Sequence, residues 1–128
     1  MVETAKITTY ERQDITTVAR VVTAAGAALV ASDLSGDLVD LKVYDMSTGQ
    51  PTLVDTVADI SGTMSALIVD GLWNLDTTGY NFKHVYNSGT ILQGGKTYNL
   101  EYTLNTDDPI GPIYVVTTVR VVALSSVG

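Results

Sequence analysis

The stretch that decides the fold is residues 91–104, ILQGGKTYNLEYTL. Its second half alternates strictly, with one side formed by Tyr98, Leu100, Tyr102 and Leu104 and the other by Asn99, Glu101 and Thr103. Two adjacent glycines, Gly94 and Gly95, come just before it. A period of two predicts a strand with one packed and one solvated face, and the glycine pair predicts the turn that leads into it.

The same period recurs along the chain. We expect seven to nine strands, spaced about 8–12 residues apart, with the last at 113–124. Turns are predicted at 24–29, 47–51 and 105–112, where glycine, proline or small polar residues gather. The one helix candidate, 17–34, is interrupted by Gly26 and begins with β-branched residues, so a strand at 16–23 followed by a turn is favoured.

This spacing predicts an all-β protein, an antiparallel sandwich or barrel. The chain of 128 residues suits one domain. We place that domain at 15–128 and interpret residues 1–14 as an N-terminal arm or an edge strand.

Composition excludes several classes of function. The chain has no cysteine, which rules out disulfides, a thiolate nucleophile and a zinc–thiolate site. Its net charge is -7 and its seven cationic residues are spread along the sequence, so nucleic acid is not an expected partner. No apolar run approaches the length of about 20 residues that spans a membrane, and the first residues do not read as a signal peptide. We expect neither a membrane partner nor a cofactor.

The one histidine, His84, alternates with Tyr80, Phe82 and Tyr86 along a predicted strand. That setting favours a packed or rim residue over a catalytic base or a metal ligand. No Gly-x-Ser-x-Gly elbow is present, although a Ser-His-Asp site assembled from distant residues stays open.

Two other patterns invite a binding interpretation. The GGKT sequence at 94–97 resembles part of a phosphate loop, but Thr90 stands where that motif needs glycine and a strand follows instead of a helix. Side chains with oxygen ligands gather in two clusters, Asp33, Asp37 and Asp40 in one and Asn105, Asp107 and Asp108 in the other. Neither group has EF-hand spacing, and turn formation is the favoured interpretation, with a calcium site left open there.

Residues 91–102 resemble the tyrosine corner of immunoglobulin-like and fibronectin-type sandwiches. The fold-defining residues are Leu92, Gly94, Gly95 and Tyr98. The resemblance implies an immunoglobulin-like sandwich in which the Tyr98 hydroxyl bonds to the backbone of the preceding corner. It also makes Trp73 a candidate for the core tryptophan of that fold, while the absence of cysteine excludes true antibody-type domains.

A second resemblance covers more of the chain. The extended segment at 12–18, the turn at 22–29, the strand at 41–45 and the hairpin at 94–102 are together similar to small virion proteins of tailed bacteriophages. That resemblance implies a non-enzymatic capsid decoration protein that binds the assembled head. Its location would be the virion, its partner the major capsid protein or another virion protein, and its own assembly a homo-oligomer such as a trimer.

The residues we expect at partner contacts are Ile7, Tyr10, Arg12, Tyr44, Tyr114 and Arg120. The segment 2–14 could add as a strand to a neighbour's sheet, and the β-branched run at 113–124 could form a sticky edge. Alternatives are a tail or baseplate adaptor, a carbohydrate- or receptor-binding sandwich that uses exposed Trp73, Tyr80 or Tyr86, and a hydrolase built around His84.

Overall fold

The computed structural model describes residues 2–4, 7–10, 13–23, 26–73, 75–87, 91–106 and 112–122, with the backbone alone described at 2–4, 7–10 and 37. These residues form nine strands and one 3-10 turn. The elements are β1 (Val2–Thr4), β2 (Ile7–Tyr10), β3 (Ile15–Val21), η1 (Ala31–Asp33), β4 (Leu34–Asp45), β5 (Thr52–Ile60), β6 (Met64–Ile68), β7 (Tyr80–Tyr86), β8 (Thr97–Thr106) and β9 (Ile113–Val122).

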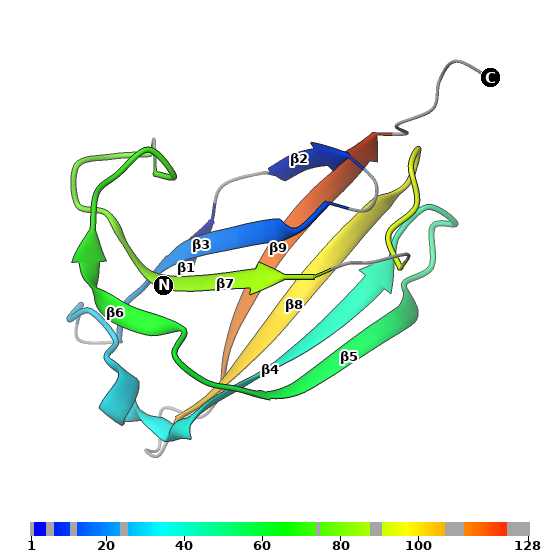
Figure 1. Cartoon of the computed structure of the whole chain (residues 1–128). Coiled ribbons are helices and arrows are strands. Elements are labelled where there is room, and N and C mark those ends of the chain that lie inside the picture. Colours follow the sequence, from blue (N-terminus) through cyan, green and yellow to red (C-terminus); the bar gives the residue numbers. More distant parts are fainter. Residues whose placement is uncertain are drawn as a thin grey trace.

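The strands form two sheets that face each other, with orders β1-β3-β7-β6 and β2-β9-β8-β4-β5 (Figure 1). Every pairing is antiparallel except β2 with β9, which is parallel. In immunoglobulin lettering the first sheet, β1-β3-β7-β6, has the strand order A-B-E-D. In the second sheet the strands that follow β2, which are β9, β8, β4 and β5, have the order G-F-C-C′. The predicted immunoglobulin-like sandwich is therefore confirmed.

The N-terminal segment divides between the two sheets. β1 pairs with β3, where Val2 lies opposite Val21, and β2 pairs with β9, where Ile7 lies opposite Val119. The segment thus supplies two edge strands to its own chain. β2 covers the second half of β9, so the interpretation of that half as a bare edge is wrong; Leu124 and Arg12 lie outside the described residues.

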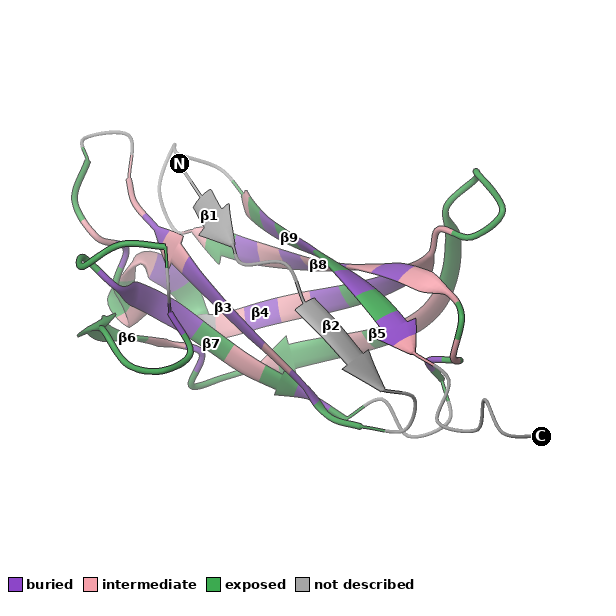
Figure 2. Cartoon of the chain, turned by 90° about the horizontal axis from the view of Figure 1, so that it is seen from above, coloured by how far each residue is buried: buried purple, intermediate pink, exposed green. Residues whose placement is uncertain are grey.

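The core lies between the sheets and follows the predicted alternation. On β8 the residues that face it are Tyr98, Leu100, Tyr102 and Leu104, and each is at most 1% exposed. Figure 2 shows the same alternation of buried and more exposed positions along β8 and β9. Burying each such side chain contributes about 1.5–3 kcal/mol, so this single strand accounts for a large part of the core.

The tyrosine corner is formed by the residues that define it in the sequence. Leu92 is buried, and the Gln93 backbone N–H donates a 3.0 Å hydrogen bond to the Tyr98 hydroxyl. Gly95 has a φ of +84°, a conformation that favours glycine, and its N–H donates to the carbonyl of Val121 at 2.8 Å. The corner therefore fixes where β8 starts and ties that start to β9.

Trp73 is not the core tryptophan of an immunoglobulin domain, so that expectation is wrong. It lies in the connection between β6 and β7 and packs with Val18 and Tyr80 in a small separate cluster. The inward positions of β4, where the immunoglobulin tryptophan would be, hold Val39, Leu41 and Val43.

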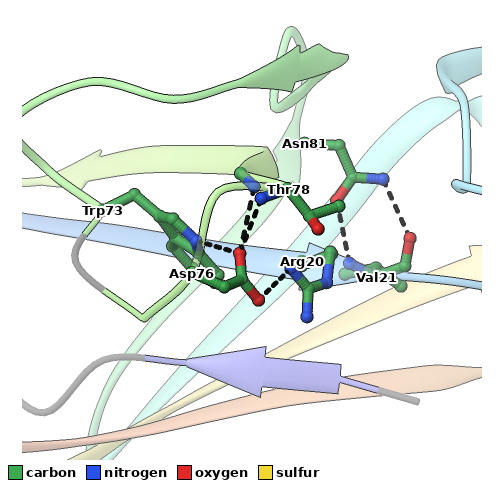
Figure 3. Close-up of polar contacts among 7 residues, drawn as sticks. Arg20, Val21, Trp73, Asp76, Thr78 and Asn81 are labelled. Carbon is green, nitrogen blue, oxygen red and sulfur yellow. Dashed lines mark hydrogen bonds and ion pairs between the residues drawn. The ribbon is translucent and has the colours of Figure 1, made fainter.

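A buried asparagine joins β7 to the end of β3. The ladder between these strands ends at the pair Ala19–Phe82. Beyond it, the Asn81 side chain accepts from the Val21 N–H at 2.8 Å and donates to the carbonyls of Val21 and Leu29 at 2.8 and 2.9 Å (Figure 3 shows its two contacts with Val21). The amide thus replaces a ladder partner and also holds the connection that follows β3.

Candidate interaction surface

The side of the five-stranded sheet that faces away from the core, here called the outer sheet face, carries three cross-strand rows. The register of β4, β8 and β9 places these rows as Tyr44–Asn99–Thr118, Lys42–Glu101–Val116 and Asp40–Thr103–Tyr114. Arg120 continues the same face of β9, opposite Thr97. The fold therefore brings together three of the sequence-predicted contact residues, Tyr44, Tyr114 and Arg120.

Apolar groups on this face are unusually exposed. Tyr114 is 52% exposed, Val116 43%, and Leu53, which pairs with Tyr44 from β5, 51%. Tyrosine and aliphatic groups at the centre of a patch with charges around them are typical of protein contact surfaces. Here Lys42, Glu101 and Arg120 supply charges of both signs, so the face suits a partner surface of mixed charge.

Sequence reasoning missed Leu53 and Val116. The signal for Val116 was available, because it shares the period-two face of Tyr114 and Arg120 along β9. Leu53 could not be placed, because β4 and β5 shift register between Val43 and Tyr44. Of the remaining predicted contacts, Ile7 and Tyr10 have only their backbones described, on β2, and Arg12 lies outside the described residues.

Asp76 fixes the connection between β6 and β7 to β3, a strand of the same four-stranded sheet. One carboxylate oxygen accepts from the Trp73 indole N–H at 2.9 Å and from the backbone N–H groups of Thr78 and Gly79, and the other contacts the Arg20 guanidinium at 2.5 Å (Figure 3). Arg20 also lies over the Trp73 ring, 5.7 Å from its centroid. The hydrogen bond from Trp73 and that from Arg20 hold the pKa of Asp76 well below its usual range.

An acid titration should release this connection. Because the folded-state pKa of Asp76 lies below its unfolded value, its contribution is complete at neutral pH and is lost as the pH falls below about 4. We expect the emission of Trp73, the one tryptophan, to shift to the red in that range. Asp76→Asn should show the red shift already at pH 7.

Asp45→Asn is the matched control for this titration. The pKa of Asp45 is also lowered, mainly by the hydrogen bonds from Ser47, but Asp45 lies at the end of β4 and does not contact Trp73 in the described structure. Its substitution should leave the emission unchanged. If Asp76→Asn shows the same Trp73 emission as the wild type at pH 7 and the same change of emission on acidification, the role assigned to Asp76 is contradicted.

The aromatic residues expected to serve as a sugar platform are buried. Trp73 is 4% exposed, Tyr80 1% and Tyr86 2%. Tyr80 and Tyr86 donate their hydroxyls to Asp70 at 2.8 Å and to Asp55 at 2.6 Å. These residues hold the fold together and offer no exposed ring to a ligand.

His84 is half-buried and packs against Tyr102. Its Nδ1 lies 2.8 Å from the Tyr102 hydroxyl, and the two rings meet edge to face with centroids 5.4 Å apart. Burial lowers the pKa of His84 and raises that of Tyr102. Within the described residues no serine or aspartate side chain hydrogen-bonds to His84, so a Ser-His-Asp arrangement is not assembled around it there.

The acidic turns do not converge in the part of the chain that the structure describes. Asp33 accepts from the Val30 N–H within its own turn, and Asp40 on β4 accepts from the Asp59 N–H on β5. No group of three potential ligands is found among the described residues. Asp107, Asp108 and the side chain of Asp37 lie outside them.

No family model and no curated protein matches the chain. In the described residues no helix is long and apolar enough to cross a membrane.

Proposed function

We propose that the chain is a non-enzymatic structural protein of a phage particle, a capsid decoration protein that binds the assembled head and stabilises it. The observation that supports this most directly is the outer sheet face, where Tyr44, Tyr114 and Arg120 come together beside exposed Leu53 and Val116. The resemblance to phage virion proteins supplies the class of partner, and the face supplies a rigid surface that could bind it.

The mechanism would be mass action. A protein that binds the assembled shell and not the separated subunits shifts the equilibrium towards the shell. The face suits this role because its central strand, β8, is paired on both sides, with β4 and with β9, so little conformational entropy is lost there when a partner covers it. Tyr114 would act as an apolar anchor, and the charged side chains elsewhere on the face would form polar contacts.

The alternatives differ in what supports them. A tail or baseplate adaptor would use the same outer sheet face and differs only in the particle component that it binds. A carbohydrate-binding module has less support, because its three proposed platform residues are buried.

The test is a binding experiment with purified phage particles from which the chain has been removed. We expect the added protein to co-sediment with assembled heads, to appear at regular positions by electron microscopy, and to remain unbound with dissociated coat subunits. Binding to tails alone would favour the adaptor. A protein that stayed free of every particle component would overturn the proposal.

A further inference from the structure

Strand β7 extends beyond its partner β6, which leaves a short open edge in the four-stranded sheet. β6 pairs with β7 only at Met64–Phe82 and Ile68–Tyr80, with a register shift between these pairs. Before Met64 the chain turns away at Gly62, whose φ is +70°. Figure 1 shows β7 continuing past the end of β6 as the chain leads back to β5.

The ladder geometry identifies the group that this edge presents. The Lys83 N–H donates to the carbonyl of Thr63 at 2.8 Å, so the backbone of Lys83 points towards β6. In an antiparallel ladder the residue two positions further along points to the same side, and that residue is Val85. Among the described residues β6 does not pair with Val85 and no carbonyl of a turn or loop accepts from its N–H, and the Val85 side chain is 43% exposed.

A cleft of about 360 Å³ lies beside this edge. Its lining includes Thr63, Ser65, Ile68, His84 and Val85. Thr63 is only 3% exposed, and no hydrogen-bond partner for its hydroxyl oxygen is found among the described residues. A buried hydroxyl without a partner is costly and uncommon, so a polar group supplied from outside would satisfy it.

We propose that this open edge binds an extended segment of a shell protein by strand addition, an inference that rests on the function proposed above. The added strand would continue the line of β6, accept a hydrogen bond from the Val85 N–H and place one polar side chain against Thr63. Backbone bonds supply affinity in such complexes and a side-chain pocket supplies specificity. Ile68, 38% exposed, flanks the cleft as an apolar contact.

An extended strand fits better than a compact ligand, because the open donor belongs to a strand edge and the cleft runs beside it. The position also suits a cementing role. The edge belongs to the four-stranded sheet, whereas the outer sheet face belongs to the other sheet. Two contact surfaces on different sheets would let one molecule join two neighbouring shell subunits.

Two substitutions test the proposal by co-sedimentation with heads that lack the chain. Val85→Pro removes the open N–H at a position where the ladder to β3 does not use it, and Thr63→Val removes the hydroxyl at nearly constant volume. Each should weaken binding about tenfold, the loss typical of one hydrogen bond. Thr63→Val should leave the melting temperature unchanged or raise it, because the buried hydroxyl forms no hydrogen bond with any described residue of the free protein.

Val85→Ala and Thr63→Ser are the matched controls, and both should bind like the wild type. Hydrogen–deuterium exchange at Val85 should slow when the wild-type protein binds heads. If the wild type binds heads while both variants bind equally well, strand addition is overturned and the proposed function stands. If the wild type binds no head, both strand addition and the proposed function are overturned. The free protein provides one more outcome. If it self-associates without heads and exchange at the Val85 N–H slows as it does so, a second copy of the chain occupies the open edge, and the proposal is overturned.

Discussion

Replacing Asn81 by leucine should lower the free energy of unfolding by about 3–5 kcal/mol. The side chain is fully buried and makes three hydrogen bonds to the backbones of Val21 and Leu29. Leucine has a similar size but no polar group, so the N–H of Val21 would lose this acceptor and two buried carbonyls would lose a donor. Each unsatisfied buried group costs about 1–3 kcal/mol. Urea denaturation followed by circular dichroism measures the change.

Asn99→Leu provides the comparison for Asn81→Leu. Asn99 also lies on a strand, but on the outer sheet face, where its side chain accepts a 3.0 Å bond from the Thr118 hydroxyl. Its loss should change stability by about 0.5 kcal/mol or less, as is usual at surface positions. Equal effects of the two substitutions would show that the Asn81 bonds to the end of β3 are not a main element of stability.

Asn81 also shows where sequence reasoning reaches its limit. Along β7 the alternation of Tyr80, Phe82, His84 and Tyr86 predicts that Asn81 faces solvent. It is buried because the connection after β3 folds back over it, and the Leu29 carbonyl accepts from its side chain. A period of two reports which side of a strand a residue occupies, but it does not report which loop covers that side.

The prediction that Trp73 is the core tryptophan of the sandwich was wrong for a related reason. The tyrosine corner could be identified because its residues are neighbours in sequence and its geometry is local, from Leu92 to Tyr98. The tryptophan was assigned by analogy of residue type, and its position depends on Asp76, three residues further along, and on Arg20, which lies far away in sequence on β3. Local patterns therefore predicted the strands and the corner, while contacts between distant segments decided where single aromatic residues lie.

The candidate surface was predictable to an intermediate extent. Tyr114 and Arg120 share one face of β9 by alternation alone, and Tyr44 falls on the polar face of its own strand. The three residues lie on the same sheet face because β8 lies between β4 and β9, and no local sequence pattern specifies that strand order. The open edge at Val85 was beyond prediction, because it follows from the point at which β6 stops pairing.

Replacing Tyr114 by alanine should weaken attachment to heads about 30-fold or more. A tyrosine anchor near the centre of an interface commonly contributes about 2 kcal/mol or more, which corresponds to this factor. Because Tyr114 is 52% exposed in the free protein, the substitution removes little buried surface and should leave the melting temperature nearly unchanged. Titrating heads that lack the chain with wild-type and variant protein measures the loss.

Two further variants decide how the result is interpreted. Tyr114→Phe keeps the ring and should retain most of the affinity if the apolar contact dominates. Val30→Ala removes a comparably exposed apolar group, 47% exposed, from the connection that precedes η1, away from the outer sheet face, and should bind like the wild type. Undiminished binding by Tyr114→Ala would remove the outer sheet face from the proposal, and equal losses in Val30→Ala would show that attachment is not specific to it. A loss confined to Tyr114→Ala, at constant stability, is the result that a dedicated attachment surface requires.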